Sequence, residues 1–392
     1  LHTSCIELSE SALRRNVRFL RRHLGPGVRL CSVIKGNAYG HSIPHFVPLA
    51  ERCGVRRFAV FSADEALATR TACTADSAIV ILGAIDDDEL AWAIENDVAF
   101  FVFDLPRLRA ALAAAGRVGR PARVHLELET GLHRTGLEQQ ELEQALDLLT
   151  ASPEAAEIEG TCTHLAGAEC VSNLPRISQQ LELFHASCAR IRERGLDPGL
   201  RHAACSAAAL RYPAPVMALV RVGVAQYGFW PTKEVRFDYR LKHQEGTGKR
   251  VVDPLRRVMR WRSRVMSVKE VGTGEFVGYG TTYQTSRNVR LAAVPVGYFH
   301  GFARSLSNLG HVLVRGRRAP VVGTVNMNMV MIDVTDVPGA IRGDEVVLIG
   351  RQRKAHLTVA SFSDLTQFLN YEVLVRLPGE IPRVVVDSSA AL

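Results

Sequence analysis

Between residues 28 and 224, short apolar runs rich in β-branched residues alternate with amphipathic stretches. We count eight runs of strand length, near residues 28–35, 56–62, 77–83, 98–104, 123–129, 157–164, 200–205 and 219–224. Helix-like segments such as 86–96, 138–152 and 174–194 separate them, and another, 9–23, precedes the first run. Eight strand–helix units predict an α/β fold, a (β/α)8 barrel of the TIM type. An open doubly wound sheet is the alternative, but no G-x-G-x-x-G motif accompanies these units.

The pattern changes after Gly228. The stretch 233–250 carries six Lys or Arg against three acidic residues, and we interpret it as a linker or surface loop. Further on, alternating strand patterns with Gly-rich turns dominate, at 259–270, 289–297, 311–315, 319–335 and 344–350. We therefore predict two domains, a barrel over residues 1–240 and a mostly β C-terminal domain over residues 241–392.

Composition excludes several functional classes. The formal charge is only +8, and no zinc-finger spacing, RNA-binding aromatic motif or phosphate loop is present, so we expect no nucleic-acid partner. The eight cysteines form no C-x-x-C pair, which argues against a metal site and a disulfide framework. No apolar run approaches the ~20 residues of a membrane helix, so we expect no membrane partner. We expect a cytoplasmic location; because the chain opens on Leu1, periplasmic or exported protein stays an alternative.

In a parallel barrel, the reacting groups lie at the C-terminal ends of the strands. Here Lys35 follows the first strand, His164 ends the sixth, Ser206 follows the seventh and Arg221 lies in the eighth. A lysine beside an apolar strand is partly desolvated, which lowers the pKa of its amine and favours imine formation. The alternative is an ordinary surface lysine at the end of a strand.

The sequence around Lys35 decides between these interpretations. Segment 34–41, IKGNAYGH, resembles the cofactor-lysine motif of the alanine racemase family, amino acid racemases of fold type III that depend on pyridoxal 5′-phosphate (PLP). Further similar motifs follow in the family's order: ETGLHRTG (129–136), THLAGAE (163–169), HAACSAA (202–208), RVGVAQYG (221–228), GYGTTY (278–283), GYFHG (297–301), VGTVNMNM (322–329) and NYEVLVRL (370–377). Each motif alone is weak evidence, but their shared order identifies the chain as a member of this family.

The resemblance implies racemisation of an amino acid, with L-alanine to D-alanine as the family reaction. PLP, held as an imine on Lys35, would stabilise a planar carbanion, and one base would serve each of its faces. Lys35 would be one base, and Tyr279 from the second subunit of a homodimer the other, so that active sites lie at the interface. An unperturbed tyrosine titrates near ~10 and needs cationic or hydrogen-bonding neighbours, for which His164 and Arg221 are candidates.

The resemblance also assigns binding roles. Arg221 would donate a hydrogen bond to the pyridine nitrogen of PLP, because a guanidinium cannot give up its proton; the weakened electron sink would disfavour transamination. The other cofactor-binding residues implied are Tyr39, His164, Ser206, Gly223, Val224 and Tyr371. For the amino acid substrate, Arg134 would hold its carboxylate or the cofactor's phenolic oxygen, Met327 would supply a backbone donor and Tyr298 would guard the channel.

Some positions depart from the family pattern. Glu127 stands where members commonly carry a carbamylated lysine, and it supplies the same negative charge, so we expect activity that does not depend on bicarbonate. Near the substrate entrance, His300 replaces the usual Asp, and Asn326 and Asn328 flank the methionine of the usual C-M-D pattern. At least two negative charges are lost, which leaves open a different or broader set of amino acid substrates.

Two further hypotheses compete with racemisation. One is a PLP-dependent decarboxylase of the same architecture, although these enzymes resemble the chain less and lack its tyrosine in this motif. The other is a non-catalytic PLP carrier, which the β domain carrying Tyr279 argues against.

Overall fold

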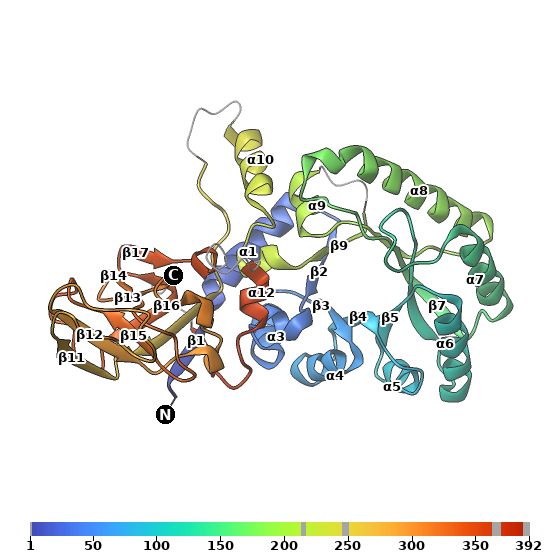
Figure 1. Cartoon of the computed structure of the whole chain (residues 1–392). Helices are drawn as coiled ribbons and strands as arrows, with labels where there is room; N and C mark the ends of the chain where they lie inside the picture. Colours follow the sequence, from blue (N-terminus) through green and yellow to red (C-terminus); the bar gives the residue numbers. More distant parts are fainter. Residues whose placement is uncertain (1, 213–216, 245–250, 363–369, 387–392) are drawn as a thin grey trace. The chain divides into compact units, whose positions relative to one another are not determined.

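The computed structural model describes residues 2–212, 217–244, 251–362 and 370–386 (Figure 1). The described residues form two compact units. One, which we call the barrel unit, contains Arg14–Gly36 and Ala50–Leu255, and the other, the β unit, contains Leu1–Leu13, Asn37–Leu49 and Arg256–Leu392. We keep the division at residue 240 as a proposal, and note that two N-terminal segments group with the β unit.

The barrel unit is built on eight parallel strands in the order β8-β7-β6-β5-β4-β3-β2-β9. Their bounds are β2 (Arg29–Val33), β3 (Arg57–Ser62), β4 (Ala78–Ala84), β5 (Val98–Val102), β6 (Ala122–Glu127), β7 (Ala156–Cys162), β8 (Leu200–His202) and β9 (Leu219–Val222). Beside β8 and β9, the N–H of Ala218 donates to the carbonyl of Arg201 at 3.0 Å, and the N–H of Arg221 donates to the carbonyl of Ala204 at 3.1 Å. The sheet is therefore a nearly closed barrel, and the predicted fold is confirmed.

The described α-helices up to residue 244 are α1 (Glu10–Leu24), α2 (Lys35–Tyr39), α3 (Ile43–Arg52), α4 (Ala63–Ala72), α5 (Leu90–Glu95), α6 (Leu105–Val118), α7 (Gln139–Ala151), α8 (Leu174–Glu193), α9 (Ser206–Arg211) and α10 (Lys233–Gln244). Helices α4 to α8 follow strands of the barrel unit and lie on the outside of its sheet (Figure 1). Local sequence explains their ends: at α6, the Asp104 carboxylate accepts the N–H of Arg107 at 2.8 Å, and Gly119 ends the helix with a φ of 73°. None of the described helices is long and apolar enough to cross a membrane.

The interpretation of 233–250 as a linker or loop is wrong for its first part. Helix α10 covers Lys233–Gln244, and it buries Val235 and Tyr239, which are four residues apart and so lie on one face. The Tyr239 ring packs edge-on against Phe19, with 5.7 Å between the ring centroids. The helix was not predicted because many of its residues are charged, and only these two apolar residues mark its buried face. Residues 245–250 lie outside the described part of the chain.

The β unit contains two sheets. In the larger, the order is β14-β13-β16-β10-β1-β18, with β17 beside β16, and the smaller has the order β11-β12-β15. The bounds are β1 (Ser4–Ser9), β10 (Met259–Arg264), β11 (Ser267–Val271), β12 (Val289–Val294), β13 (His311–Val314), β14 (Arg317–Pro320), β15 (Val330–Asp333), β16 (Glu345–Gln352), β17 (Ala355–Leu357) and β18 (Arg383–Val386), together with helix α12 (Asn370–Val375). The predicted mostly β domain is confirmed, and the run 259–270 divides between both sheets.

Strand β1 lies between β10 and β18, antiparallel to the first and parallel to the second. Ile6 faces Trp261 in this register, and both side chains are fully buried. This pairing could not be predicted from the sequence, because it joins segments more than 250 residues apart and leaves no local pattern.

Candidate active site

Lys35 stands at the end of β2, directly after the fully buried Ile34, and begins α2. The residue retains exposed surface, but partial burial lowers the pKa of its amine, and the charge of Arg134 lowers it further. The carboxylate of Glu65 raises the pKa of Lys35, and the charge of Arg221 lowers it as Arg134 does. A larger share of neutral amine is therefore available at this position than on an isolated lysine.

The chain after Lys35 adopts an unusual backbone. From Gly36 to Gly40, five consecutive residues have positive φ, namely 62°, 52°, 55°, 51° and 77°. This left-handed turn costs about 1–2 kcal/mol for each residue that is not glycine. The ring Nδ1 of His41 donates to the carbonyls of Ala38 and Tyr39, at 2.9 Å each, and holds the turn. Strain of this kind concentrates at functional sites.

Two strands of the barrel are tied together beside Lys35 by Gln226. Its side-chain amide donates to the carbonyls of Val33 and Val222, at 3.0 Å each, and its Oε1 accepts the hydroxyl of Ser32 at 2.7 Å. These contacts fix the end of β2, which carries Lys35, against the end of β9, which carries Arg221.

The guanidinium of Arg221 is buried and held by the barrel backbone. Its Nη2 donates to the carbonyl of Thr163 at 2.8 Å, and its Nη1 donates to the carbonyl of His202 at 3.1 Å. Nη1 also bonds the ring Nδ1 of His202, and Nη2 lies 3.5 Å from Nδ1 of His164. Because so many contacts converge, the orientation of Arg221 is determined before any ligand binds.

His164 follows β7 and is half-buried. Burial, together with the charges of Arg221, Arg134 and Lys35, lowers the pKa of its imidazole to about 3. The ring is therefore neutral at neutral pH. Gln180 of α8 orients this loop by donating to the carbonyl of His164 at 3.1 Å. Three cationic groups thus act on one neutral ring, an arrangement that suits an anionic ligand.

Ser206 and Gly223 meet at the ends of the neighbouring strands β8 and β9. The N–H of Gly223 donates to the hydroxyl of Ser206 at 2.9 Å, and both residues are buried. Val224 follows and begins a 3-10 turn, Val224–Tyr227. The structure therefore brings together three residues that the family resemblance assigned to cofactor binding.

Glu127 lies at the end of β6 and is buried, with 4% of its surface exposed. Burial raises the pKa of its carboxyl, whereas the hydroxyl of Thr135, which donates to it at 2.8 Å, and the charges of Arg221 and Arg134 lower that pKa. The loop that carries Arg134 is held by Glu129, whose carboxylate accepts backbone N–H groups of 131–133. Burial of Glu127 dominates, so the pKa of its carboxyl is raised overall, and its role toward Arg134 stays a prediction.

The remaining predicted residues lie in the β unit. Tyr279 is 76% exposed, and the flanking Gly278 and Gly280 have positive φ, which turns the chain sharply around it. The hydroxyl of Thr324 donates to the carbonyl of Tyr279 at 3.3 Å and joins this loop to the segment that carries Met327. Tyr298 and Met327 are 40% and 54% exposed.

Two backbone hydrogen bonds bring the Tyr298 turn onto the Met327 segment. The N–H of Tyr298 donates to the carbonyl of Asn326, and the N–H of Phe299 donates to the carbonyl of Met327, at 3.0 Å each. Tyr279, Tyr298 and Met327 are therefore on adjoining loops of the β unit. Tyr371 is the second residue of α12 and is 37% exposed.

His300 does not present a charge at the surface. The N–H of Gly297 donates to its Nδ1 at 3.2 Å, so the hydrogen lies on Nε2, which faces the hydroxyl of Thr3 at 3.3 Å. Burial lowers the pKa of this ring. The histidine therefore stabilises its own turn, and the neutral Asn326 and Asn328 remain as the changes on the adjoining loop.

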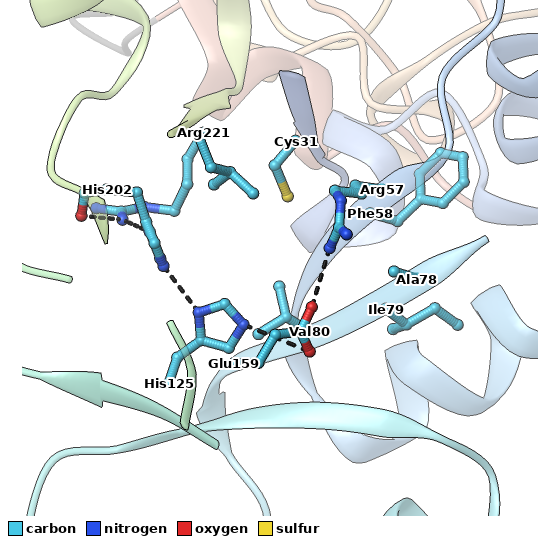
Figure 2. A pocket seen from close by; sticks show the side chains of 11 residues that line it. Cys31, Arg57, Phe58, Ala78, Ile79, Val80, His125, Glu159, His202 and Arg221 are labelled. Carbon is cyan, nitrogen blue, oxygen red and sulfur yellow. Dashed lines mark hydrogen bonds and ion pairs between the residues drawn. The ribbon is translucent and has the colours of Figure 1, made fainter. Parts of the chain in front are cut away.

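The sequence analysis missed His125 and Glu159 inside the barrel, and it gave no role to His202, which begins the motif 202–208. The three side chains line an internal pocket of the barrel unit together with Arg221, Arg57 and Cys31 (Figure 2). These residues could have been noticed in the sequence, because ionisable side chains are rare at the buried positions of a barrel strand. They were overlooked because the apolar runs that contain them were used only to predict the strands.

Comparison with known proteins agrees with this geometry. The model of "Alanine racemase, N-terminal domain" matches residues 8–231, and that of "Alanine racemase, C-terminal domain" matches residues 258–385. The alanine racemase of Leptospira interrogans is 34% identical over 388 residues, which cover 98% of this chain and 96% of that protein. The alanine racemase of Sorangium cellulosum is 36% identical over 390 residues, covering 96% and 97%.

Solved structures show the same similarity. Alanine racemase from Streptomyces lavendulae, a producer of D-cycloserine, superposes with a TM-score of 0.87 at 30% identity and covers 99% of this chain and 98% of its own. Alanine racemase from Bartonella henselae with covalently bound pyridoxal phosphate has a TM-score of 0.81 at 25% identity, covering 98% and 100%.

Proposed function

This chain belongs to the alanine racemase family, and we propose on that premise that it interconverts L- and D-alanine with PLP carried by Lys35. The observation that supports the proposal most strongly is the environment of Lys35, an amine of lowered pKa at the end of a barrel strand. Amines that form imines with a cofactor need to lose their proton readily. The relatives are racemases along both units, so we do not retain the decarboxylase and carrier hypotheses.

The residues present fit an anionic cofactor. Lys35, Arg134 and Arg221 all act on His164, and only partial compensation comes from Glu65 and the buried Glu127. We propose Ser206, Gly223 and Val224 as donors to the phosphate, with Tyr39 and Tyr371 completing its binding site. When bound, PLP supplies an electron-withdrawing ring that stabilises negative charge at the α-carbon of an amino acid.

Arg221 would limit how strongly that ring withdraws electrons. A guanidinium only donates hydrogen bonds, so Arg221 would leave the pyridine nitrogen without a proton of its own. The neutral His164 beside it adds no positive charge. This combination favours return of a proton to the α-carbon over competing reactions such as transamination.

Two bases move the α-proton in the proposed mechanism. The Nζ of Lys35 serves one face of the α-carbon, and the phenolic oxygen of Tyr279 of the partner subunit serves the other. Arg134 and the backbone of Met327 would hold the substrate carboxylate, which a charge-assisted contact orients. Tyr298 would narrow the path by which the substrate enters.

A homodimer with shared sites is part of the proposal. Tyr279, Tyr298, Phe299 and Met327 expose between 40% and 76% of their surface on adjoining loops. Exposed clusters of aromatic and Met side chains are typical of protein interfaces. The substrate side chain beyond alanine stays open, because Asn326 and Asn328 carry no charge. A cytoplasmic location also stays a prediction, which fractionation of native cells tests.

The activity is tested in deuterated water with a panel of L-amino acids. We expect deuterium at the α-carbon together with formation of the D-enantiomer, fastest for alanine. Lys35→Ala should remove both the activity and the absorbance band of the bound cofactor. If the purified protein loaded with PLP racemises no amino acid in the panel, or if Lys35→Ala retains the band, the proposal is wrong.

A further inference from the structure

A line of polar side chains runs through the inside of the barrel from Arg221 (Figure 2). The Nη1 of Arg221 donates a hydrogen bond to Nδ1 of His202 on β8. The Nε2 of His202 in turn lies 2.8 Å from Nδ1 of His125 on β6. Nε2 of His125 then faces Oε2 of Glu159 on β7 at 3.8 Å. The line thus joins Arg221 to a carboxylate through two imidazole rings.

The chemistry of Arg221 fixes every proton along this line. A guanidinium has only donors, so Nδ1 of His202 must accept, and the ring proton of His202 must lie on Nε2. Nε2–H of His202 then donates to Nδ1 of His125, which leaves the ring proton of His125 on Nε2, facing Glu159. With both rings neutral, only one arrangement satisfies all three contacts.

Burial keeps both rings neutral. His125 and His202 expose 2% and 1% of their surface. Burial lowers the pKa of His202, and the charge of Arg221 lowers it further. Burial also lowers the pKa of His125, although Glu159 opposes that shift. Both shifts favour the neutral ring, and the bond from the Arg221 guanidinium to Nδ1 of His202 leaves no room for a second proton on that ring.

Glu159 remains charged at the far end. Burial alone would raise its pKa, but His125, Arg123 and Arg57 outweigh burial and hold it at about 2. Arg57 on β3 and Arg123 on β6 each lie 2.9 Å from one carboxylate oxygen. Phe101 stacks on His125, with 5.8 Å between ring centroids, and restricts rotation of that ring. The carboxylate is thus an anchored acceptor.

We propose that His125 and Glu159 are positioning residues for Arg221. By placing the ring proton of His202 on Nε2, they keep its Nδ1 as an acceptor for Nη1 of Arg221. The two terminal nitrogens of Arg221 then point to His202, Thr163 and His164, which leaves the Nε–H to donate to the cofactor. The inference rests on the proposed role of Arg221 in binding PLP, and it extends that role to two residues that do not touch the cofactor.

The ring protons can be observed directly by ¹⁵N NMR of histidine-labelled protein, both without PLP and as the loaded dimer. We expect both rings to carry their proton on Nε2 throughout the range of about pH 6 to 9, where an unperturbed histidine would change its charge. A proton on Nδ1 of His202, or titration of either ring in this range, overturns the inference. This measurement needs no substitution and no activity.

Glu159→Gln removes the charge at the end of the line and keeps its shape. Glu51→Gln is the matched control, because Glu51 is a buried carboxylate of the barrel unit that accepts hydrogen bonds from Thr74 and Ser77. We expect Glu159→Gln to mix the two ring forms of His202. We also expect it to shift the pH profile of the cofactor absorbance and to lower kcat about 10-fold or more, as loss of an outer partner of a metal-bound histidine does.

The KM for alanine should change less than about 2-fold in Glu159→Gln, since His125 and Glu159 do not touch the substrate. Equal ring spectra and equal pH profiles for Glu159→Gln and Glu51→Gln contradict the inference. If Glu159→Gln does not fold, the ring protons of the wild type still decide. A wild type that shows the expected ring protons but racemises nothing refutes the proposed function and leaves the proton arrangement standing.

Discussion

At the scale of single residues, the electrostatics of this barrel depend on a small set of cations. Lys35, Arg134 and Arg221 each lower the pKa of His164, whose ring stays neutral as a result. The same two arginines also lower the pKa of Lys35. Each group therefore holds its neighbours in the protonation state that the proposed chemistry requires, and an anionic cofactor would relieve the repulsion among them.

Glu127 allows a prediction about bicarbonate. Its carboxylate supplies negative charge next to Arg134 without any modification, so removal of carbon dioxide from the buffer should leave the racemisation rate unchanged. Glu127→Gln should lower the rate several-fold, and Glu138→Gln, on an exposed carboxylate, should not. A rate that falls on decarbonation and recovers on addition of bicarbonate would contradict this role of Glu127.

The motifs predicted which residues of the barrel unit gather at one end of the strands. Lys35, His164 and Ser206 were predicted because each follows or ends an apolar run, and Arg221 because it lies within the last run, near the end of the barrel where a parallel barrel places its active site. His125 and Glu159 were missed, since their partners lie on other strands and contacts across a barrel leave no local pattern. The burial of His300 could not be predicted from the sequence either, because it depends on the turn around His300 and on the distant Thr3.

At the scale of secondary-structure elements, the left-handed turn of α2 is the most unusual feature. Asn37 has some preference for this conformation, but no propensity predicts it for Ala38 and Tyr39, and the turn persists through hydrogen bonds made by His41 and Asn37. The strands and most helices, in contrast, followed from apolar periodicity. Helix α10 was missed because only Val235 and Tyr239 mark its buried face.

Gly40 ends this turn, and a substitution at this position tests how tightly the turn is packed. A Cβ at Gly40 would lie 2.0 Å from the backbone carbonyl oxygen of Leu374, whereas a Cβ at Gly27, which has a similar φ, would meet no atom within 4 Å. Gly27→Ala should cost about 1–2 kcal/mol, the usual penalty for a residue with a side chain in the left-handed region. Gly40→Ala should cost at least about 3 kcal/mol, because a backbone clash cannot be relieved by a side-chain rotation.

Guanidinium unfolding of both variants measures these costs, and a cofactor titration shows whether the Gly40→Ala protein still binds PLP. Equal losses of stability in Gly40→Ala and Gly27→Ala would mean that the contact with Leu374 does not constrain the turn.

At the scale of the whole molecule, sequence-distant segments build each compact unit. The β unit combines β1 and residues 37–49 with the C-terminal part of the chain. Composition and periodicity predicted both architectures but could not assign these N-terminal segments, because the pairing of β1 with β10 and β18 is a tertiary interaction.

Buried histidines make the molecule sensitive to acid. The unfolded chain protonates a histidine near pH 6.5, but burial lowers the pKa of His41 to about 4 in the fold. Between these values the unfolded state binds more protons, so stability is complete above about pH 6.5 and is lost as the pH falls toward 4. His41 alone should cost about 2 kcal/mol between pH 7 and pH 5.

Thermal unfolding at pH 7 and pH 5 measures this effect as a fall in Tm. The fall should be smaller in His41→Gln than in the wild type, whereas His185→Gln, at an exposed position, should behave as the wild type does. An unchanged or higher Tm at pH 5 would show that the buried histidines are not kept neutral by the fold.

The proposed homodimer predicts complementation between inactive variants. Lys35→Ala and Tyr279→Phe each remove one base, so each homodimer should be inactive. Unfolding and refolding them together in equal amounts should produce mixed dimers with one intact site, and about one quarter of wild-type activity by random pairing of subunits. Absence of activity in a mixture that contains the mixed dimer would show that a site does not draw Lys35 and Tyr279 from different subunits.

The central claim is that Lys35 and Tyr279 act on opposite faces of the α-carbon, and isotope exchange by Tyr279→Phe tests it most directly. L-alanine and D-alanine are incubated separately with this variant in deuterated water, and deuterium and configuration are read for each. We predict that one enantiomer exchanges its α-hydrogen with retention, through Lys35, that the other exchanges none, and that neither is racemised. Racemisation, or exchange into both enantiomers at equal rates, would contradict the two-base account.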